Sequence, residues 1–385
     1  MKRIAWALVL LFAAPHAWAA SKITVGQLED LLHSLQQSKK TDAEVADKLK
    51  DVELTEELTT KRTDNLVSAL PGKLSIEQIY VLEARSAVLA PPAVDLPNSA
   101  APDAAAQKTL LDKAVSYVNN LYVQQPHLTA TKTTLRFQDN TEAVSSASSF
   151  RSGTSADEVR MNDNQATPFV HYINATEAPV EIQNGAEMVS RAKDSTRWGA
   201  NAMIVLKGQG PVLSTVLREA QTAGKMNWLR WETVSGRTTA VFAYSVDQNT
   251  SRYAVKYCCF PDIDRYGETK DGLNWMSYMQ ASTNWKDFTA TVPYHGEIFV
   301  DQRTGIVLRL ITEAEFKASD LVHLENQRID YGPVTVGGKP MVLPIKAVIN
   351  TEVSANGDAT AGRFVTRRTL FSVSYKDYQL AGAAH

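Results

Sequence analysis

Residues 294–310, YHGEIFVDQRTGIVLRL, decide the fold of this 385-residue chain. Two runs rich in apolar and β-branched residues flank the pentapeptide 301–305, DQRTG. Such runs are typical of β-strands, and Gly305 stands where a tight turn needs a positive φ, which glycine adopts without steric cost. The stretch therefore predicts an antiparallel hairpin with strands at 296–301 and 305–313.

Similar strand patterns occupy much of the chain on both sides of this hairpin. They lie at residues 131–137, 169–173, 238–246, 252–259, 341–350 and 363–375. Residues 211–223 interrupt them with apolar positions at helical spacing. Because strands do not alternate with helices, the order favours an antiparallel sheet over a parallel α/β fold. We predict an α+β fold, in which a curved antiparallel sheet forms an incompletely closed β-barrel around that helix and a small helical module precedes it.

The N-terminus has the parts of a secretory signal peptide. Lys2 and Arg3 precede the apolar run 4–14, and small residues at Ala17 and Ala19 match the cleavage pattern. The run is too short to span a bilayer, and no later window has the roughly 20 apolar residues that a membrane helix needs. We therefore predict that residues 1–19 are a signal peptide, and that the protein is exported to the periplasm or the extracellular space without a transmembrane span.

The charge balance bears on one class of partner. The formal net charge is −2, and it becomes −4 when Lys2 and Arg3 leave with the signal peptide. Nucleic-acid binding relies on a basic surface that neutralises phosphates. A nearly neutral balance gives no sign of such a surface, so we expect no nucleic-acid partner.

The exported chain divides into a helical module at 20–89, a Pro- and Ala-rich linker at 90–106, and a main domain at 107–385 that begins with a helix at 107–123. Capping boxes in the module begin at Thr24, Thr41 and Ser75, each followed three residues later by Gln or Glu. Amphipathic helices usually pack a core. We therefore favour a packing role for the module over docking of an envelope protein, and keep the second as an alternative.

The hairpin at 294–310 also carries a resemblance to a known family. Together with residues 329–334 and 337–344, it resembles the late strands of the outer-membrane lipoprotein carrier superfamily, which includes periplasmic sensors that restrain an anti-sigma factor. The matching positions are Asp301, Thr304, Gly305 and Pro344. The whole chain also resembles a family of exported bacterial proteins of unknown function with a Tyr-Cys-Cys strand. The carrier resemblance implies an incompletely closed barrel that holds acyl chains or peptides, and a binding role without chemistry.

Two adjacent cysteines, Cys258 and Cys259, are the only ones in the chain. In a regular strand their side chains point to opposite faces, and the Cys-x-x-Cys spacing of redox sites is absent. A zinc site needs further ligands that do not cluster nearby. Because an exported protein meets oxidising conditions, we favour a disulfide between these neighbours, which ends its strand before Pro261, over two free thiols.

Aromatic residues define the predicted ligand site. Alternation places Trp228, Phe242, Tyr244 and Tyr257 on the interior side of their strands. The segment 261–293 is predicted to be a long loop that includes Trp275 and Tyr278, and an exposed loop of this composition is costly. It serves either as a mobile lid over an apolar cavity or as a permanent plug.

Catalytic motifs are missing from the sequence. There is no His-Glu-x-x-His, no Gly-x-Ser-x-Gly, no phosphate-binding loop and no dinucleotide glycine pattern. We therefore predict no enzymatic activity, no cofactor and no metal site. The predicted function is that of an exported binding protein of the cell envelope that holds an apolar ligand, a lipid tail or an extended peptide. The alternative is a structural or regulatory protein-interaction module whose barrel is filled by its own side chains.

Overall fold

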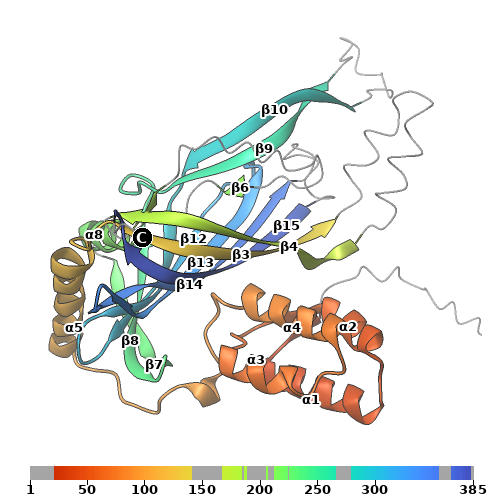
Figure 1. Ribbon diagram of the computed structural model, residues 1–385, viewed down its shortest axis with the longest axis horizontal. Helices are drawn as coiled ribbons and strands as arrows, with labels where there is room; N and C mark the ends of the chain where they lie inside the picture. The colour runs from red at the N-terminus through yellow and green to blue at the C-terminus, as the bar shows by residue number, and fades with distance from the viewer. Residues whose placement is uncertain are drawn as a thin grey trace, which may run out of the picture.

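The computed structural model describes residues 21–140, 167–183, 186–188, 205–206, 212–223, 225–265, 279–354 and 366–382. The predicted signal peptide, residues 1–19, lies outside them. The described chain forms an N-terminal helical module and a large antiparallel sheet, with two further helices at one end of that sheet (Figure 1).

The helical module has its own apolar core. Its elements are β1 (Ser21–Ile23), α1 (Val25–Gln37), α2 (Asp42–Lys50), β2 (Val52–Leu54), α3 (Thr60–Val67) and α4 (Lys73–Arg85). Strands β1 and β2 pair in parallel. The connector, residues 90–103, contains a short 3-10 turn, Ala93–Asp95. It leads to α5 (Ala104–Tyr117), which the π-helical turn Val118–Tyr122 follows. It is held to the rest of the protein, since the indole N–H of Trp231 donates to the carbonyl of Ala100 at 2.8 Å.

Two of the three predicted capping boxes are confirmed. Thr24 caps α1 and Thr41 caps α2. Each threonine hydroxyl accepts from the backbone N–H three positions later, and each threonine N–H donates to the side chain of that residue, Gln27 or Glu44. The third prediction is wrong, because Ser75 lies inside α4 and Gly72 is the N-cap. There Asp42 of α2 replaces the local cap and accepts from the Ser75 N–H at 2.9 Å and the Ser75 hydroxyl at 2.6 Å. A side chain from another helix therefore satisfies this helix start.

Ten strands form the main sheet, and every pairing in it is antiparallel. Their order across the sheet is β5-β4-β3-β15-β14-β13-β12-β11-β8-β7. The bounds are β3 (Leu128–Asn140), β4 (Thr167–Gln183), β5 (Ala186–Met188), β7 (Met226–Val234), β8 (Arg237–Val246), β11 (Tyr294–Asp301), β12 (Val307–Ala314), β13 (Val322–Val336), β14 (Lys339–Ser354) and β15 (Thr366–Leu380).

A second sheet has three strands. It consists of β6 (Val205–Leu206), β9 (Ala254–Arg265) and β10 (Met279–Thr291), in the order β10-β9-β6. The predicted loop at 261–293 is therefore wrong in its bounds, because β9 continues through Pro261, which pairs with Trp285 of β10. Proline does not end this strand, and residues 266–278 between the two strands lie outside the described part.

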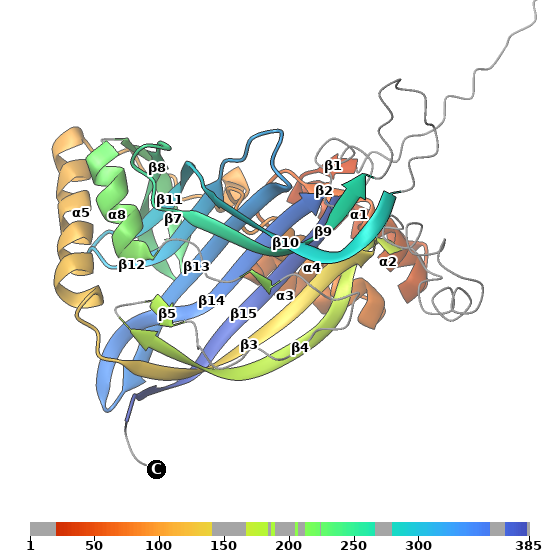
Figure 2. The same ribbon diagram turned by 90° about the horizontal axis from the view of Figure 1, so that it is seen from above.

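The predicted fold class is wrong. The structure is mostly antiparallel sheet, with 47% strand and 29% helix, and the ten-stranded sheet is open, with β5 and β7 at its two edges. The predicted helix at 211–223 is α8 (Leu213–Ala223), which stands beside α5 at one end of the sheet (Figure 2). The sheet does not close because its edge strands β5 and β7 do not pair with each other, while β9 and β10 form a separate sheet and β8 pairs directly with β11. Alternation identifies a strand and its two faces, but it does not identify its neighbours.

The two faces of the main sheet contact different parts of the protein. One face packs on α5 and α8, and its buried residues include Phe242, Tyr244, Ile298, Leu310 and Tyr331. The residues that alternate with these along the strands point to the other face, toward the helical module. One cluster there joins α4 and the segment after it to β3, β14 and β15. The sheet therefore separates a core under two helices from an interface with the module.

The turn predicted between β11 and β12 is confirmed. The Asp301 carboxylate accepts from the Thr304 N–H and the Thr304 hydroxyl, both at 2.7 Å, and Gly305 has a φ of +76°. A Cβ at this position would lie 2.5 Å from the Cβ of Lys113 in α5. The turn therefore needs glycine both for its backbone conformation and for the approach of α5.

Replacing Gly305 with alanine is expected to lower the free energy of unfolding by about 1–3 kcal/mol, because it forces a side chain into the left-handed region and against α5. Urea denaturation measures the change. Gly338→Ala is the control, since Gly338 has a similar φ of +77° but no atom within 4 Å of the position that a Cβ would take. Equal losses in the two variants would show that the contact with α5 contributes nothing.

Candidate functional site

The aromatic residues predicted to bind a ligand lie mostly inside the core. Phe242 and Tyr244 are buried on the face that packs on α5 and α8. The Tyr244 hydroxyl donates to the carbonyl of Ile311 at 2.7 Å, and the Trp228 ring packs 5.7 Å from that of Phe242. The structure brings these three together as contacting core residues.

The other predicted site residues are separate from them. Tyr257 is buried in a small cluster with Val322 and Val353. Trp275 and Tyr278 lie outside the described residues. Cys258 and Cys259 belong to β9, but their side chains are outside the described part of the chain, so the disulfide stays a prediction.

A group of buried charges joins the helical module to the main sheet. Glu57, 3% exposed, follows β2 and pairs with Arg328 of β13. Arg309 of β12 lies 2.6 Å from Asp330, 3.2 Å from Glu232 and 3.7 Å from Glu57. We call these five residues the charged junction.

Electrostatics within the charged junction are strong because water is largely excluded. Burial would raise the pKa of Asp330, but the guanidinium groups of Arg328 and Arg309 lower it to about 2. For Glu232, burial outweighs its arginine partners and raises the pKa. Arg309 contacts three carboxylates at once and is the centre of the junction.

Helix α4 also contacts the sheet directly. The side-chain amide of Asn350 in β14 donates to the carbonyl of Ala84 at 3.3 Å and to the side-chain oxygen of Asn326 at 2.9 Å. Lys346 lies 3.1 Å from Glu83 on the other side of the helix. These contacts leave a cavity on each side of α4.

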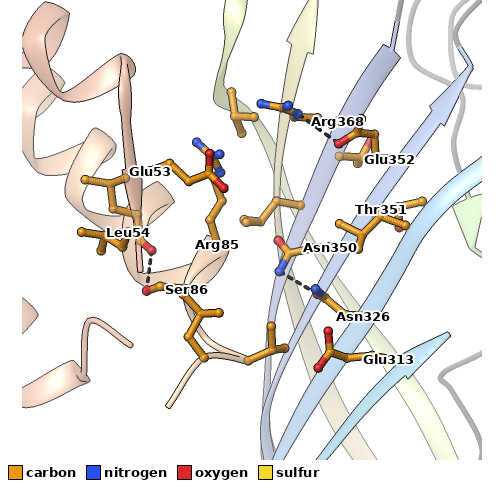
Figure 3. Close-up of a pocket in the computed structure, with 17 residues that line it drawn as sticks. Glu53, Leu54, Arg85, Ser86, Glu313, Asn326, Asn350, Thr351, Glu352 and Arg368 are labelled. Carbon is orange, nitrogen blue, oxygen red and sulfur yellow. Dashed lines mark hydrogen bonds and ion pairs between the residues drawn. The ribbon is translucent and has the colours of Figure 1, made fainter. Parts of the chain in front are cut away.

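The cavity beside the charged end of α4 has a volume of about 270 Å³ and opens between the module and the sheet (Figure 3). We call it the interface cavity. Its apolar lining comes from both bodies and consists of Leu54, Leu82, Val88, Leu89, Val170, Leu324 and Leu370. Its polar lining consists of Glu53, Arg85, Ser86, Glu313, Asn326, Asn350, Thr351, Glu352, Arg368 and Thr369.

Each carboxylate of the interface cavity lies near a lysine, an arginine or a histidine side chain. Glu352 lies 3.2 Å from Arg368, Glu313 lies 3.8 Å from His295, and Glu53 lies 3.8 Å from Lys22. Nearby, Asp139 accepts from the backbone N–H of Arg368 at 2.9 Å, while burial raises its pKa to about 6. The cavity therefore combines an apolar wall with charged groups that are largely paired.

A second cavity of about 260 Å³ lies on the other side of α4. Its lining includes Tyr80, Leu135, Phe137, Lys346 and Val348. Its lysine is already paired with Glu83. It offers an apolar surface, and among the described residues that line it the one charge without an ion pair is the exposed carboxylate of Asp64, which would repel an anion.

A row of buried polar residues, two of which also line the interface cavity, crosses four adjacent strands. Glu325, Thr351, Thr369 and Gln138 stand directly opposite one another in the register. The second carboxylate oxygen of Glu325 and both threonine hydroxyls have no hydrogen-bond partner within the described structure. Burial raises the pKa of Glu325 to about 7, although the Tyr253 hydroxyl donates to it. A charged Glu325 is therefore costly here.

Comparison with known proteins yields no relative. No family model, no curated protein and no solved structure matches this chain. None of the helices among the described residues is long and apolar enough to cross a membrane. Nor do three or more potential metal ligands gather anywhere within residues 21–140 and the other described ranges.

Sequence analysis missed the residues of the interface. Arg309 carries a usable signal, because it is the one charge in the apolar run 306–311, IVLRLI, and a charge in such a strand needs a partner. Arg85 carries none, because charged residues at the end of an amphipathic helix are ordinary. The residues that surround Arg85 are known only from the structure, in which α4 docks against β14 and β15.

Proposed function

We propose that this chain is an exported, non-catalytic binding protein of the cell envelope, and that its ligand places an apolar segment in the interface cavity. The observation that carries the proposal is the cavity itself, about 270 Å³ with leucine and valine side chains from both the module and the sheet. Binding pockets are typically concave and largely apolar, with a few polar groups that orient the ligand. Export rests on the signal-peptide pattern in residues 1–19.

The alternative positions for an apolar ligand have less support. The aromatic side chains of Trp228, Phe242 and Tyr244 pack against one another and against α8. A ligand there would have to displace core side chains, at a cost typical of overpacking. The interface cavity requires no such displacement.

Filling the interface cavity is expected to abolish binding. In Leu324→Trp the larger side chain occupies the space, and the affinity for octanol, a neutral probe with an apolar chain, should fall at least about tenfold. Isothermal titration calorimetry measures it. Leu229→Trp is the control, since Leu229 is 44% exposed on β7, and its affinity should equal that of the unsubstituted protein. Absence of octanol binding by the unsubstituted protein, or unchanged binding by Leu324→Trp, would refute the proposal.

The second candidate is a structural or regulatory interaction protein. It is favoured by the filled core under α5 and α8, and by Leu74 and Tyr80 of α4, which are exposed apolar residues of the module. Native mass spectrometry of protein purified from its own host separates the candidates. A copurified small molecule supports the binding protein, whereas a bare mass within a stable protein complex supports the interaction protein.

A further inference from the structure

We infer that the ligand of the interface cavity carries an anionic group, a carboxylate or a phosphate, which binds Arg85 while its apolar segment lies along the leucine side chains. This inference rests on the proposed function and names the ligand class for the same site. It follows from the pairing of charges around the cavity, the position of Arg85 and the size of the space.

Arg85 differs from the other charged residues of the interface cavity. Arg368 has Glu352, and the remaining carboxylates have His295, Lys22 or a backbone N–H. Within the described chain, Arg85 has no ion pair and no side-chain hydrogen bond. Because guanidinium groups present five donors in a planar fork, this leaves a bidentate site for a carboxylate or phosphate.

The surroundings of Arg85 disfavour its charge in the free protein. Burial and the neighbouring Arg368 lower its pKa, and the carboxylates nearby compensate only in part. In Figure 3 Arg85 and Arg368 both border the space between α4 and the sheet, from opposite sides. An anion bound between them would offset the repulsion between the two guanidinium groups. It would also supply the hydrogen-bond acceptors that water no longer provides there.

The rest of the interface cavity determines the size of the ligand. Its volume of about 270 Å³ has room for about nine groups of the size of a water molecule. The wall beside Arg85 includes Leu54, Leu82 and Leu89 of the module and Leu324 and Leu370 of the sheet. A monoanion with an unbranched chain of about eight carbons matches both the volume and the wall. We therefore take octanoate as the probe.

Octanoate and octanol share a chain and differ in the charge of the head group. The protein is expected to bind octanoate about 10- to 100-fold more tightly than octanol at pH 7, which is the range for a charge-assisted hydrogen bond. In Arg85→Gln the affinity for octanoate should fall about 10- to 100-fold, and the preference for octanoate over octanol should be lost. Isothermal titration calorimetry measures all four values. Arg303→Gln, an exposed arginine in the turn between β11 and β12, is the control and should behave as the unsubstituted protein.

The outcomes separate the inference from the proposed function. Equal binding of octanol and octanoate, or an Arg85→Gln variant that retains the preference, would overturn the anionic site and leave the apolar cavity in place. Failure of both probes to bind would overturn the proposed function as well. Octyl phosphate distinguishes the two head groups, because tighter binding than octanoate identifies a phosphate ligand and weaker binding identifies a carboxylate.

Discussion

Arg309→Met is expected to lower the free energy of unfolding by about 3–5 kcal/mol, the range measured when one member of a buried ion pair is removed. Arg309 contacts Asp330, Glu232 and Glu57, and the substitution leaves the half-buried Asp330 and the two buried glutamates with fewer cationic partners. Urea denaturation at pH 7 measures the loss. Because Glu57 belongs to the helical module, the variant should also be cut faster by proteases in the connector at 90–103.

The matched control is Arg237→Met. Arg237 pairs with Asp301 at 3.3 Å, but its side chain is 41% exposed, so the loss should be below about 1 kcal/mol. An Arg309→Met variant as stable as this control would show that the charged junction contributes nothing to docking of the module. A protein stabilised by the substitution would show that desolvation of the charges outweighs their attraction.

Glu325→Gln is expected to have the opposite sign and to stabilise the protein at alkaline pH. The pKa of Glu325 rises from 4.5 to about 7 through burial, a shift that corresponds to about 3 kcal/mol. The folded protein therefore holds a proton that the unfolded chain has lost between about pH 4.5 and 7, and stability falls as pH rises through this window. Glutamine resembles the neutral acid, so the variant should gain up to about 3 kcal/mol at pH 8 and almost nothing at pH 4.

Denaturation curves at the two pH values measure this difference. Glu315→Gln is the control, since Glu315 is exposed and its substitution should change stability by less than about 0.5 kcal/mol at either pH. A Glu325→Gln variant with the same stability gain at pH 4 and pH 8 would show that ionisation of Glu325 is not the cause. A loss at pH 8 would show that the carboxylate has a stabilising partner.

Most of the candidate site could not be predicted from the sequence. Alternation placed Phe242 and Tyr244 correctly on a buried face, but it could not distinguish a ligand cavity from a packed core, because both need apolar side chains on the same side of a strand. Arg85 and Arg368 are 283 positions apart in the chain, and their approach depends on where α4 docks. Nothing local to either residue indicates that one is paired and the other is not.

Features that depend on neighbours along the chain were predictable from the sequence alone. The turn at 301–305, the positive φ of Gly305 and the helix caps at Thr24 and Thr41 follow from backbone sterics and from hydrogen bonds that span three or four residues. Strand pairing, in contrast, depended on the tertiary structure, since a strand has the same alternation whatever lies beside it. The separation of β9 and β10 into their own sheet, the unpaired edges at β5 and β7, and the interface cavity formed where α4 docks on β14 and β15 all depend on contacts between segments far apart in the chain. The energy of such contacts cannot be deduced from either segment alone.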